Sequence, residues 1–322
     1  MPEPSASPKR RGRLLRFGAA LVVLLALAGY LAVQYVTGGR GAPGCRVVSG
    51  GDDKAAYDLT PEQAVNAATI AAVGTGRRMP ERAVTIALAT ALQESGLRNI
   101  EHGDRDSLGL FQQRPSQGWG TEQQILDPTY AAGVFYQHLA EVHDYAKLPL
   151  TVAAQRVQRS GFPEAYAKHE PDAELLSAAL TGHSAATLTC DGRPAATPAT
   201  GPDGVRAALV RDFGRDALQP AAVEVGAAST PAPASTPGAR TVTLPVDTDT
   251  SPAKGRGARQ RGWQLAHWAV ANSSALHIER VQYGGREWIA GNTDSRWRTV
   301  AAGSGAGGAR QGSGAVRIVT AQ

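Results

Sequence analysis

The chain has 322 residues, is 42% hydrophobic and carries a net charge of +5. This length allows about two domains and a sizeable core, while 37 Gly and 20 Pro indicate that part of the chain is linker. The charge is uneven: residues 57–182 carry ten basic and fifteen acidic side chains, and both ends carry a basic surplus. A nucleic-acid-binding protein would concentrate Lys and Arg on its folded domain, so the composition argues against that class.

The N-terminal segment has the pattern of an export signal. Five basic residues within residues 1–16 precede an uncharged, largely apolar run from Phe17 to Val36. At the rise of an α-helix, this run spans roughly 30 Å, the thickness of a membrane's hydrocarbon core. The pattern predicts a cytoplasmic basic tail over 1–16 and a transmembrane anchor over 17–36, with the body outside the cell membrane. The alternative is a signal peptide cleaved near Ala26–Ala28 and a secreted protein.

The two cysteines agree with export. A Gly-rich spacer is expected over residues 37–56, and Cys45 within it and Cys190 enclose the segment between them. In an oxidising compartment this pair predicts a disulfide that ties together the two ends of one domain. Two cysteines without a Cys/His cluster do not form a metal site, so no metal is expected.

Helical signals fill the segment between the cysteines. Thr60-Pro61 has the pattern of a helix start, and that helix is expected to run to about Val73. A second helix from about Pro80 to Leu92 is apolar on nearly all sides, which is typical of a central, buried helix. Further helices are expected from Asp127-Pro128 and over Thr151–Ser160 and Pro163–Leu180, whereas residues 95–120 have the composition of an ordered functional loop. The chain is therefore predicted to be mainly α, with an all-α domain within residues 57–190.

The pattern is weaker beyond Cys190. Residues 191–257 have linker composition, with a possible helix over 203–217 and strand-like alternation at 241–246. Residues 258–322 predict a small α+β module of unknown role. It would contain a helix from Arg259, strands at 277–283 and 287–289 joined by a Gly284-Gly285 turn, and strand-like segments at 297–301 and 315–319.

Glu94 is the candidate catalytic residue. It follows Ala83, Ala87 and Ala91 by eleven, seven and three residues, which places its carboxyl on a stripe of small side chains at the end of the buried helix. Apolar surroundings and the negative end of the helix dipole both disfavour the charged form, so its pKa should be raised. A carboxyl still protonated near neutral pH can protonate a glycosidic oxygen. The alternative is an ordinary carboxylate at a helix end.

Two sequence blocks extend this interpretation. Glu94-Ser95-Gly96-Leu97, followed by the block from Ser107 to Pro115, resembles the soluble lytic transglycosylase and goose-type lysozyme group. With the segment from Gln155 to Pro163, the chain looks like a secreted actinobacterial branch of that superfamily. The resemblance covers roughly residues 57–182 and implies a lysozyme-like fold that acts on peptidoglycan.

The resemblance also implies roles for single residues. Glu94 would act first as general acid and then as base, Gln112 would line the sugar-binding groove, and Ser95 would hold the site in place. A later family helix usually carries Asn beside Tyr, and in this chain Gln158 stands in that region. The candidate substrate-binding residues are Ser95, Gln112, Gln113, Gln158 and Tyr166.

Several residues have two interpretations. Asp104 and Asp106 are either a second carboxylate, as hydrolytic chemistry requires, or turn-forming residues. Gln112 and Gln113 either bind sugar or satisfy backbone groups of the loop. Trp119 and Tyr166 either stack on sugar rings or belong to the core.

The sequence thus predicts an enzyme of lytic-transglycosylase type that cleaves the β-1,4 bond between amino sugars. Its partners would be glycan strands and the membrane, and this one-acid route needs no cofactor. The alternatives are a hydrolytic lysozyme that uses Asp104 or Asp106 and a non-catalytic module that binds the cell wall.

Overall fold

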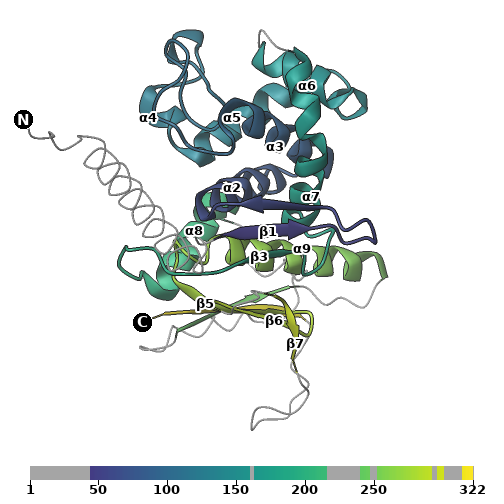
Figure 1. Cartoon of the computed structure of the whole chain (residues 1–322), viewed down its shortest axis with the longest axis vertical. Helices are drawn as coiled ribbons and strands as arrows, with labels where there is room; N and C mark the ends of the chain where they lie inside the picture. Colours follow the sequence, from purple (N-terminus) through teal and green to yellow (C-terminus); the bar gives the residue numbers. More distant parts are fainter. Residues whose placement is uncertain are drawn as a thin grey trace, which may run out of the picture. The chain divides into compact units, whose positions relative to one another are not determined.

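The computed structural model describes residues 44–159, 163–215, 240–246, 252–291, 296–300 and 314–321. They form a mixed α+β structure of helices and two antiparallel sheets (Figure 1). The predicted tail and anchor, residues 1–36, lie outside the described residues. Within the part of the chain that the structure does describe, no helix is both long and apolar enough to cross a membrane.

The helical layer contains the predicted helices, except that the helix expected over Pro163–Leu180 is a 3₁₀ segment up to His169 and an α-helix only from Glu170. Thr60 caps its helix through a capping box: its hydroxyl accepts from the Gln63 amide N–H at 3.2 Å, and the Gln63 side chain accepts from the Thr60 N–H at 2.8 Å. Asp127 caps another helix by accepting from Thr129 N at 2.8 Å. The layer consists of α2 (Pro61–Gly76), α3 (Glu81–Ser95), α4 (Glu122–Ile125), α5 (Pro128–Glu141), α6 (Leu150–Gln158) and α7 (Glu170–Leu180), with short 3₁₀ turns η1 (Pro115–Gln117), η2 (Tyr145–Lys147) and η3 (Pro163–His169).

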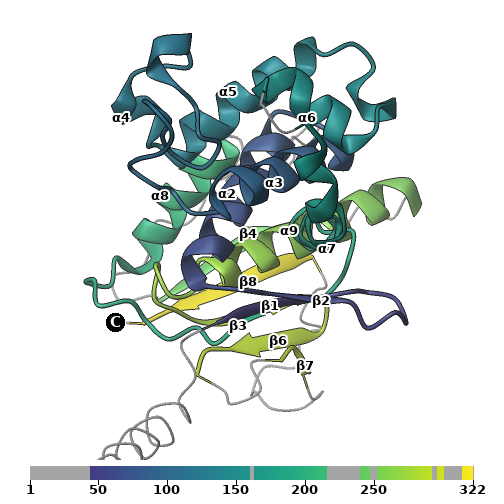
Figure 2. The same ribbon diagram turned by 45° about the horizontal axis from the view of Figure 1, so that its top comes forward.

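Helix α3 is the central element of this layer, as its composition predicted. Every residue from Ala83 to Leu92 is buried, and α3 packs against α2, α5, α6 and α7 (Figure 2). The small alanines allow these neighbours to approach on several sides. The C-terminal end of α3, which carries Glu94, is therefore held by helices distant in sequence.

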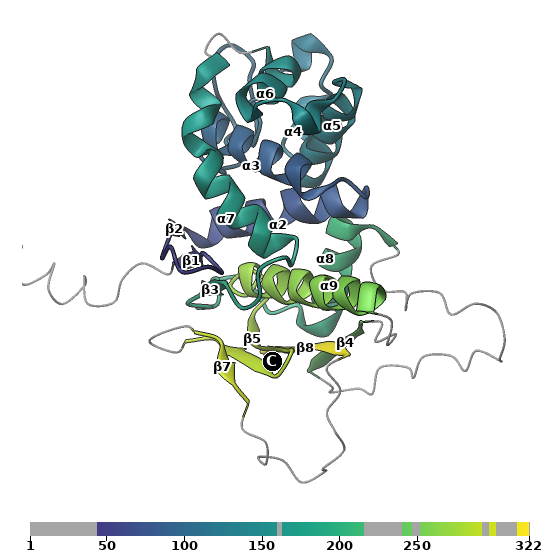
Figure 3. The same cartoon turned by 90° about the vertical axis from the view of Figure 1, so that its right-hand side faces the viewer.

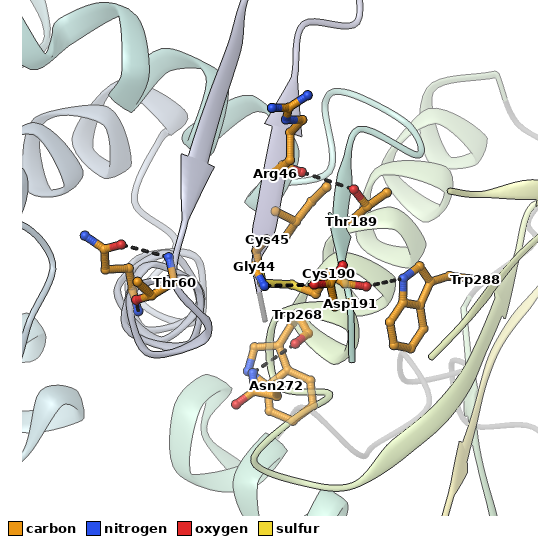
Figure 4. Close-up of a disulfide and its surroundings, with 12 residues drawn as sticks. Gly44, Cys45, Arg46, Thr60, Thr189, Cys190, Asp191, Trp268, Asn272 and Trp288 are labelled. Carbon is orange, nitrogen blue, oxygen red and sulfur yellow. Dashed lines mark hydrogen bonds between the residues drawn. A yellow bond between two sulfur atoms is a disulfide. The ribbon is translucent and has the colours of Figure 1, made fainter. Parts of the chain in front are cut away.

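Strands at both ends of the predicted all-α domain correct that prediction. β1 (Cys45–Val48), β2 (Ala56–Leu59) and β3 (Leu188–Cys190) form an antiparallel sheet in the order β2-β1-β3. Cys45 pairs with Cys190 in register, with 3.9 Å between their Cα atoms, and the predicted disulfide joins them (Figure 4). Part of the expected spacer over 37–56 is thus a strand. The reason is that β1 finds hydrogen-bonding partners on both sides only after the chain has folded.

The segment after Cys190 contains more structure than a linker followed by a small module. α8 (Gly201–Phe213) overlaps the possible helix predicted over 203–217, and β4 (Thr241–Pro245) joins a five-stranded antiparallel sheet of order β4-β8-β5-β6-β7. The other strands are β5 (Ile278–Tyr283), β6 (Arg286–Ile289), β7 (Arg298–Thr299) and β8 (Ala315–Thr320). The long helix α9 (Pro252–Ala271) packs against β5 and β8.

Helix α9 joins this sheet to the helical layer. It lies between the five-stranded sheet and helices α2 and α7 (Figures 1 and 3). Gln264 donates to Thr75 of α2 at 2.7 Å, and the fully buried His267 contacts the Ala179 carbonyl of α7 at 2.7 Å. The described parts of the expected domain and module therefore share one hydrophobic core.

Candidate active site

Glu94 lies in the last turn of α3, half-buried. The helix ends because Gly96 adopts a left-handed conformation, φ 63°, and the N–H groups of Gly96 and Leu97 return to the carbonyls of Leu92 and Ala91. This sharp ending turns the chain away directly after Ser95. The Glu94 carboxyl is consequently left beside the loop that follows.

Two side chains distant in sequence meet Glu94. The hydroxyl of Tyr166, in η3, donates to Glu94 Oε1 at 2.6 Å. Gln158, at the end of α6, also hydrogen-bonds the carboxylate, and its Nε2 donates to the Phe111 carbonyl at 2.7 Å. Gln158 therefore links the candidate acid to the loop. The structure thus places Gln158 and Tyr166, two of the predicted site residues, against Glu94.

The pKa of Glu94 is raised above its ordinary value. Burial is the main cause, because a charged carboxylate loses water there. The hydrogen bonds from Tyr166 and Gln158 favour the ionised form and so act in the opposite direction. Burial disfavours ionisation of the Glu94 carboxyl, but the ionised carboxylate is stabilised by the hydrogen bonds from Tyr166 and Gln158. This balance suits a group that gives up a proton and later takes one back.

Ser95 holds the loop rather than facing a ligand. Its side chain is buried, and its hydroxyl lies 2.8 Å from the Leu110 carbonyl and 3.1 Å from the Ala91 carbonyl. The bond to Leu110 ties the end of α3 to the middle of the loop. This agrees with the role implied by the resemblance, that of holding the site in place.

The two glutamines of the loop differ in exposure. Gln113 is 1% exposed, its Nε2 donates to the Ala131 carbonyl at 3.1 Å, and its backbone forms a β-bridge with Leu108. Gln112 is partly exposed and adopts φ 47°, an uncommon backbone conformation for a residue with a side chain. Such local strain is often found at functional sites. Of the two side chains, only that of Gln112 reaches the surface, and its Nε2 donates to the Gly109 carbonyl at 3.2 Å.

The two aspartates of the loop occupy different environments. Asp106 accepts from Arg114 Nε at 2.6 Å and from the Ser116 backbone N–H at 2.9 Å. Hydrogen bonds from Ser116 and then Arg114 hold the pKa of Asp106 well below its usual range. Asp106 is therefore a fixed carboxylate that shapes the loop, whereas Asp104 is exposed on the loop surface.

The aromatic candidates belong mostly to the packing. Tyr166 is fully buried, which leaves no face of its ring for a sugar, so its hydroxyl is its contact with the site. Trp119 is half-buried, and its ring lies 4.5 Å from that of His138. Within the described ranges, no group of three or more His, Cys, Asp or Glu side chains is arranged to hold a metal ion.

Two further residues support the site and were not predicted. Asn66 of α2, which is buried, donates to the Leu97 carbonyl at 2.8 Å, and Gln63 donates to the Gly96 carbonyl at 2.8 Å. They bind carbonyls exposed by the sharp end of α3. The signal in the sequence was Asn66 itself, a polar residue between Val65 and Ala67.

Comparisons with known proteins do not assign the chain to a family. No protein-family model matches the chain, and no curated protein matches it significantly.

Proposed function

We propose that this protein is a peptidoglycan-acting glycosidase of lytic-transglycosylase type with a lysozyme-like domain, and that Glu94 is its general acid and base. The observation that carries the proposal is the half-buried Glu94 carboxyl, which has a raised pKa and receives the Tyr166 hydroxyl at 2.6 Å. A group of this kind performs acid–base catalysis near neutral pH. The loop beside it supplies Gln112 as a polar side chain for the sugar.

In the proposed reaction, protonated Glu94 gives its proton to the oxygen of the β-1,4 bond. The bond between that oxygen and the sugar's anomeric carbon breaks, and the leaving sugar departs as an alcohol. Tyr166 and Gln158 stabilise the carboxylate left on Glu94. That carboxylate then takes a proton from a hydroxyl of the sugar that holds the anomeric carbon. The oxygen of this hydroxyl bonds to the anomeric carbon and closes an anhydro ring. Glu94 is protonated again, and no water is consumed.

This route needs only one carboxyl group, that of Glu94. The two aspartates of the loop, Asp104 and Asp106, are not placed to supply a second. Hydrolysis would need a second carboxylate that acts as nucleophile or as base toward water. Asp106 is already held by Arg114 and Ser116, and Asp104 is exposed. Neither observation favours the hydrolytic alternative, so the anhydro-forming reaction is the one proposed.

The test is digestion of purified peptidoglycan by the full-length chain, followed by mass analysis of the products. Glu94→Gln preserves shape and hydrogen bonding but cannot supply the proton, so its rate should fall by about 10²–10⁴-fold. Asp104→Asn and Asp106→Asn are matched controls, because each removes one carboxylate from the adjacent loop. Each of them should slow the reaction much less.

Two outcomes would contradict this proposal. Equal rates of anhydro-sugar release by wild type and Glu94→Gln would show that the proton donor is another group. Release of nothing by wild type from any peptidoglycan tested would favour a non-catalytic wall-binding module.

We further propose that residues 17–36 anchor the protein in the cell membrane, with its body outside. The disulfide between Cys45 and Cys190 supports an oxidising location. The N-terminus of the mature protein checks the anchor: protein that begins near Gly29 in the culture medium would show that the segment is a cleaved signal peptide instead.

A further inference from the structure

A cavity lies outside the candidate active site. The cavity of about 690 Å³ is lined by residues of the three-stranded sheet, by Arg286 of β6 and by the segment that leads into β7. This volume falls within the range of small-molecule sites, about 300–1,000 Å³. Neither Glu94 nor Tyr166 or Gln158 lines it. Any ligand of this cavity would therefore bind apart from the proposed chemistry.

Strand alternation directs two arginines of different sheets to this cavity. In β1 the side chains of Cys45 and Val47 are buried, so Arg46 points to the opposite, open face. In β6 Arg286 shares its face with Trp288, two residues later, whose indole reaches β3. Arg296, just before β7, supplies a third guanidinium to the lining. Two regions far apart in the sequence, one with Arg46 and the other with Arg286 and Arg296, thus converge on one cavity.

Two tryptophans fix the walls. β3 pairs with β1 along one edge. On its other edge, the carbonyls of Leu188 and Cys190 accept hydrogen bonds from two tryptophan side chains instead of from a strand. Trp297 Nε1 donates to the Leu188 carbonyl at 2.8 Å, and Trp288 Nε1 donates to the Cys190 carbonyl at 3.0 Å. Figure 4 shows the Trp288 indole directed at the disulfide-bonded end of β3. Both indoles are buried, so the arginines project from anchored backbone.

The charges of the cavity are unequally matched. Arg46 is held by Asp58 through two bonds, of 2.6 and 2.9 Å, and these two charges cancel. Asp191 accepts from the Gly44 N–H at 3.1 Å. Arg286 and Arg296 form no ion pair with any other described residue. The lining therefore presents a positive surplus beside the buried Trp297.

We propose that this cavity, the arginine cleft (Arg46, Arg286, Arg296 and Trp297), binds a ligand that carries phosphate or carboxylate groups. The two unmatched guanidinium groups, Arg286 and Arg296, make the main contacts. Guanidinium donors match both oxyanions in a two-pronged geometry. A cleft of this size accommodates an organic anion or the end of an anionic polymer rather than only a single inorganic ion. The proposal is independent of the glycosidase activity.

The test is calorimetric titration of the full-length chain with two probes, tripolyphosphate and citrate, at low and at moderate ionic strength. The cleft variant is Arg286→Gln with Arg296→Gln. The matched control is Arg280→Gln with Arg317→Gln, which removes the same amount of charge from the sheet that contains Arg286. Arg280 is paired with Ile289, and Arg317 with Gln282, which is itself paired with Glu287. Ile289 and Glu287 alternate along β6 with Arg286 and Trp288, so Arg280 and Arg317 lie on the opposite face of the sheet from Arg286.

Saturable binding of either probe by wild type is expected, with affinity reduced by about tenfold or more in the cleft variant and scarcely changed in the control. Binding of tripolyphosphate alone assigns the cleft to phosphates, and binding of citrate alone assigns it to carboxylates. Two results overturn the proposal. One is equal weakening by both double variants, which indicates diffuse attraction to a basic surface. The other is the absence of saturable binding of both probes by wild type in which circular dichroism shows the native fold.

Discussion

His267 should make the stability of this protein strongly dependent on pH. Its ring is fully buried at the contact of α9 with α7, and its two nitrogens meet the Ala179 carbonyl at 2.7 Å and the Thr187 N–H at 3.2 Å. Since the Thr187 N–H needs an acceptor, Nε2 carries no proton and Nδ1–H donates to Ala179. The neutral ring satisfies both partners. Burial lowers the pKa of His267 from 6.5 to about 4.

The size of the pH effect on stability follows from the difference between the pKa of His267 in the unfolded chain and in the folded protein. In the unfolded chain His267 takes up its proton near its ordinary pKa, so between pH 6.5 and 4 the unfolded state binds more protons than the folded state. The stabilisation is complete above pH 6.5 and is lost as pH falls toward 4. At about 1.4 kcal/mol for each pH unit, acidification removes about 3 kcal/mol of unfolding free energy. This is a large share of the ~5–15 kcal/mol typical of folded proteins.

Urea unfolding at several pH values between 7 and 4 provides the assay. His267→Gln removes the proton linkage, so its unfolding free energy should fall less steeply with acid than that of wild type, although it is less stable at pH 7. The control is His143→Gln, at a highly exposed histidine, which should follow wild type. Carboxylates that titrate near pH 4 affect all three proteins alike, so the difference isolates His267.

Parallel stability curves for wild type and His267→Gln over this range would refute the reasoning. The same holds for an NMR titration in which the His267 imidazole of folded wild type takes up its proton near pH 6.5. This second measurement needs no variant, so it remains decisive if His267→Gln fails to fold.

Tyr166→Phe should raise the pKa of Glu94 further, because the hydroxyl donor favours the ionised carboxylate. An NMR titration of the Glu94 carboxyl measures this, with Tyr130→Phe as control, since Tyr130 donates to the Trp119 carbonyl; a lower or unchanged pKa in Tyr166→Phe would contradict the assignment. Reduction of the Cys45–Cys190 disulfide should lower the melting temperature, because in the chain-entropy model a crosslink over 145 residues contributes about 5 kcal/mol. Unchanged melting after complete reduction, verified by thiol labelling, would show that the sheet alone holds the two ends together.

Local patterns in the sequence were sufficient to predict the helices around Glu94. Thr60 and Asp127 mark helix starts because their side chains satisfy free N–H groups within three residues. The apolar run up to Leu92 identified α3 as buried, and this placed Glu94 at the end of a buried helix. The disulfide followed from the number of cysteines and the expected compartment. Each of these features depends on neighbours along the chain or on composition.

Tertiary structure decided which residues surround Glu94. Tyr166 and Gln158 had been selected as sugar-binding candidates, yet Tyr166 is buried and reaches the acid through its hydroxyl. Ser95 and Gln113 proved to be internal supports of the loop. Hydrophobic periodicity tells which face of a helix is buried, but it does not tell which distant side chain will lie against it. That depends on how α3, α6 and η3 pack together.

The same limit explains the C-terminal half. The sequence pattern predicted helix α9 and several strands of the five-stranded sheet, but it did not predict the contact of α9 with α2 and α7. The burial of His267 and the capping of β3 by Trp288 and Trp297 exist only when segments about 80 to 109 residues apart come together. An edge strand with unpaired carbonyls must find donors somewhere. The sequence by itself determined that tryptophans were available, and only the fold determined that two of them would serve β3.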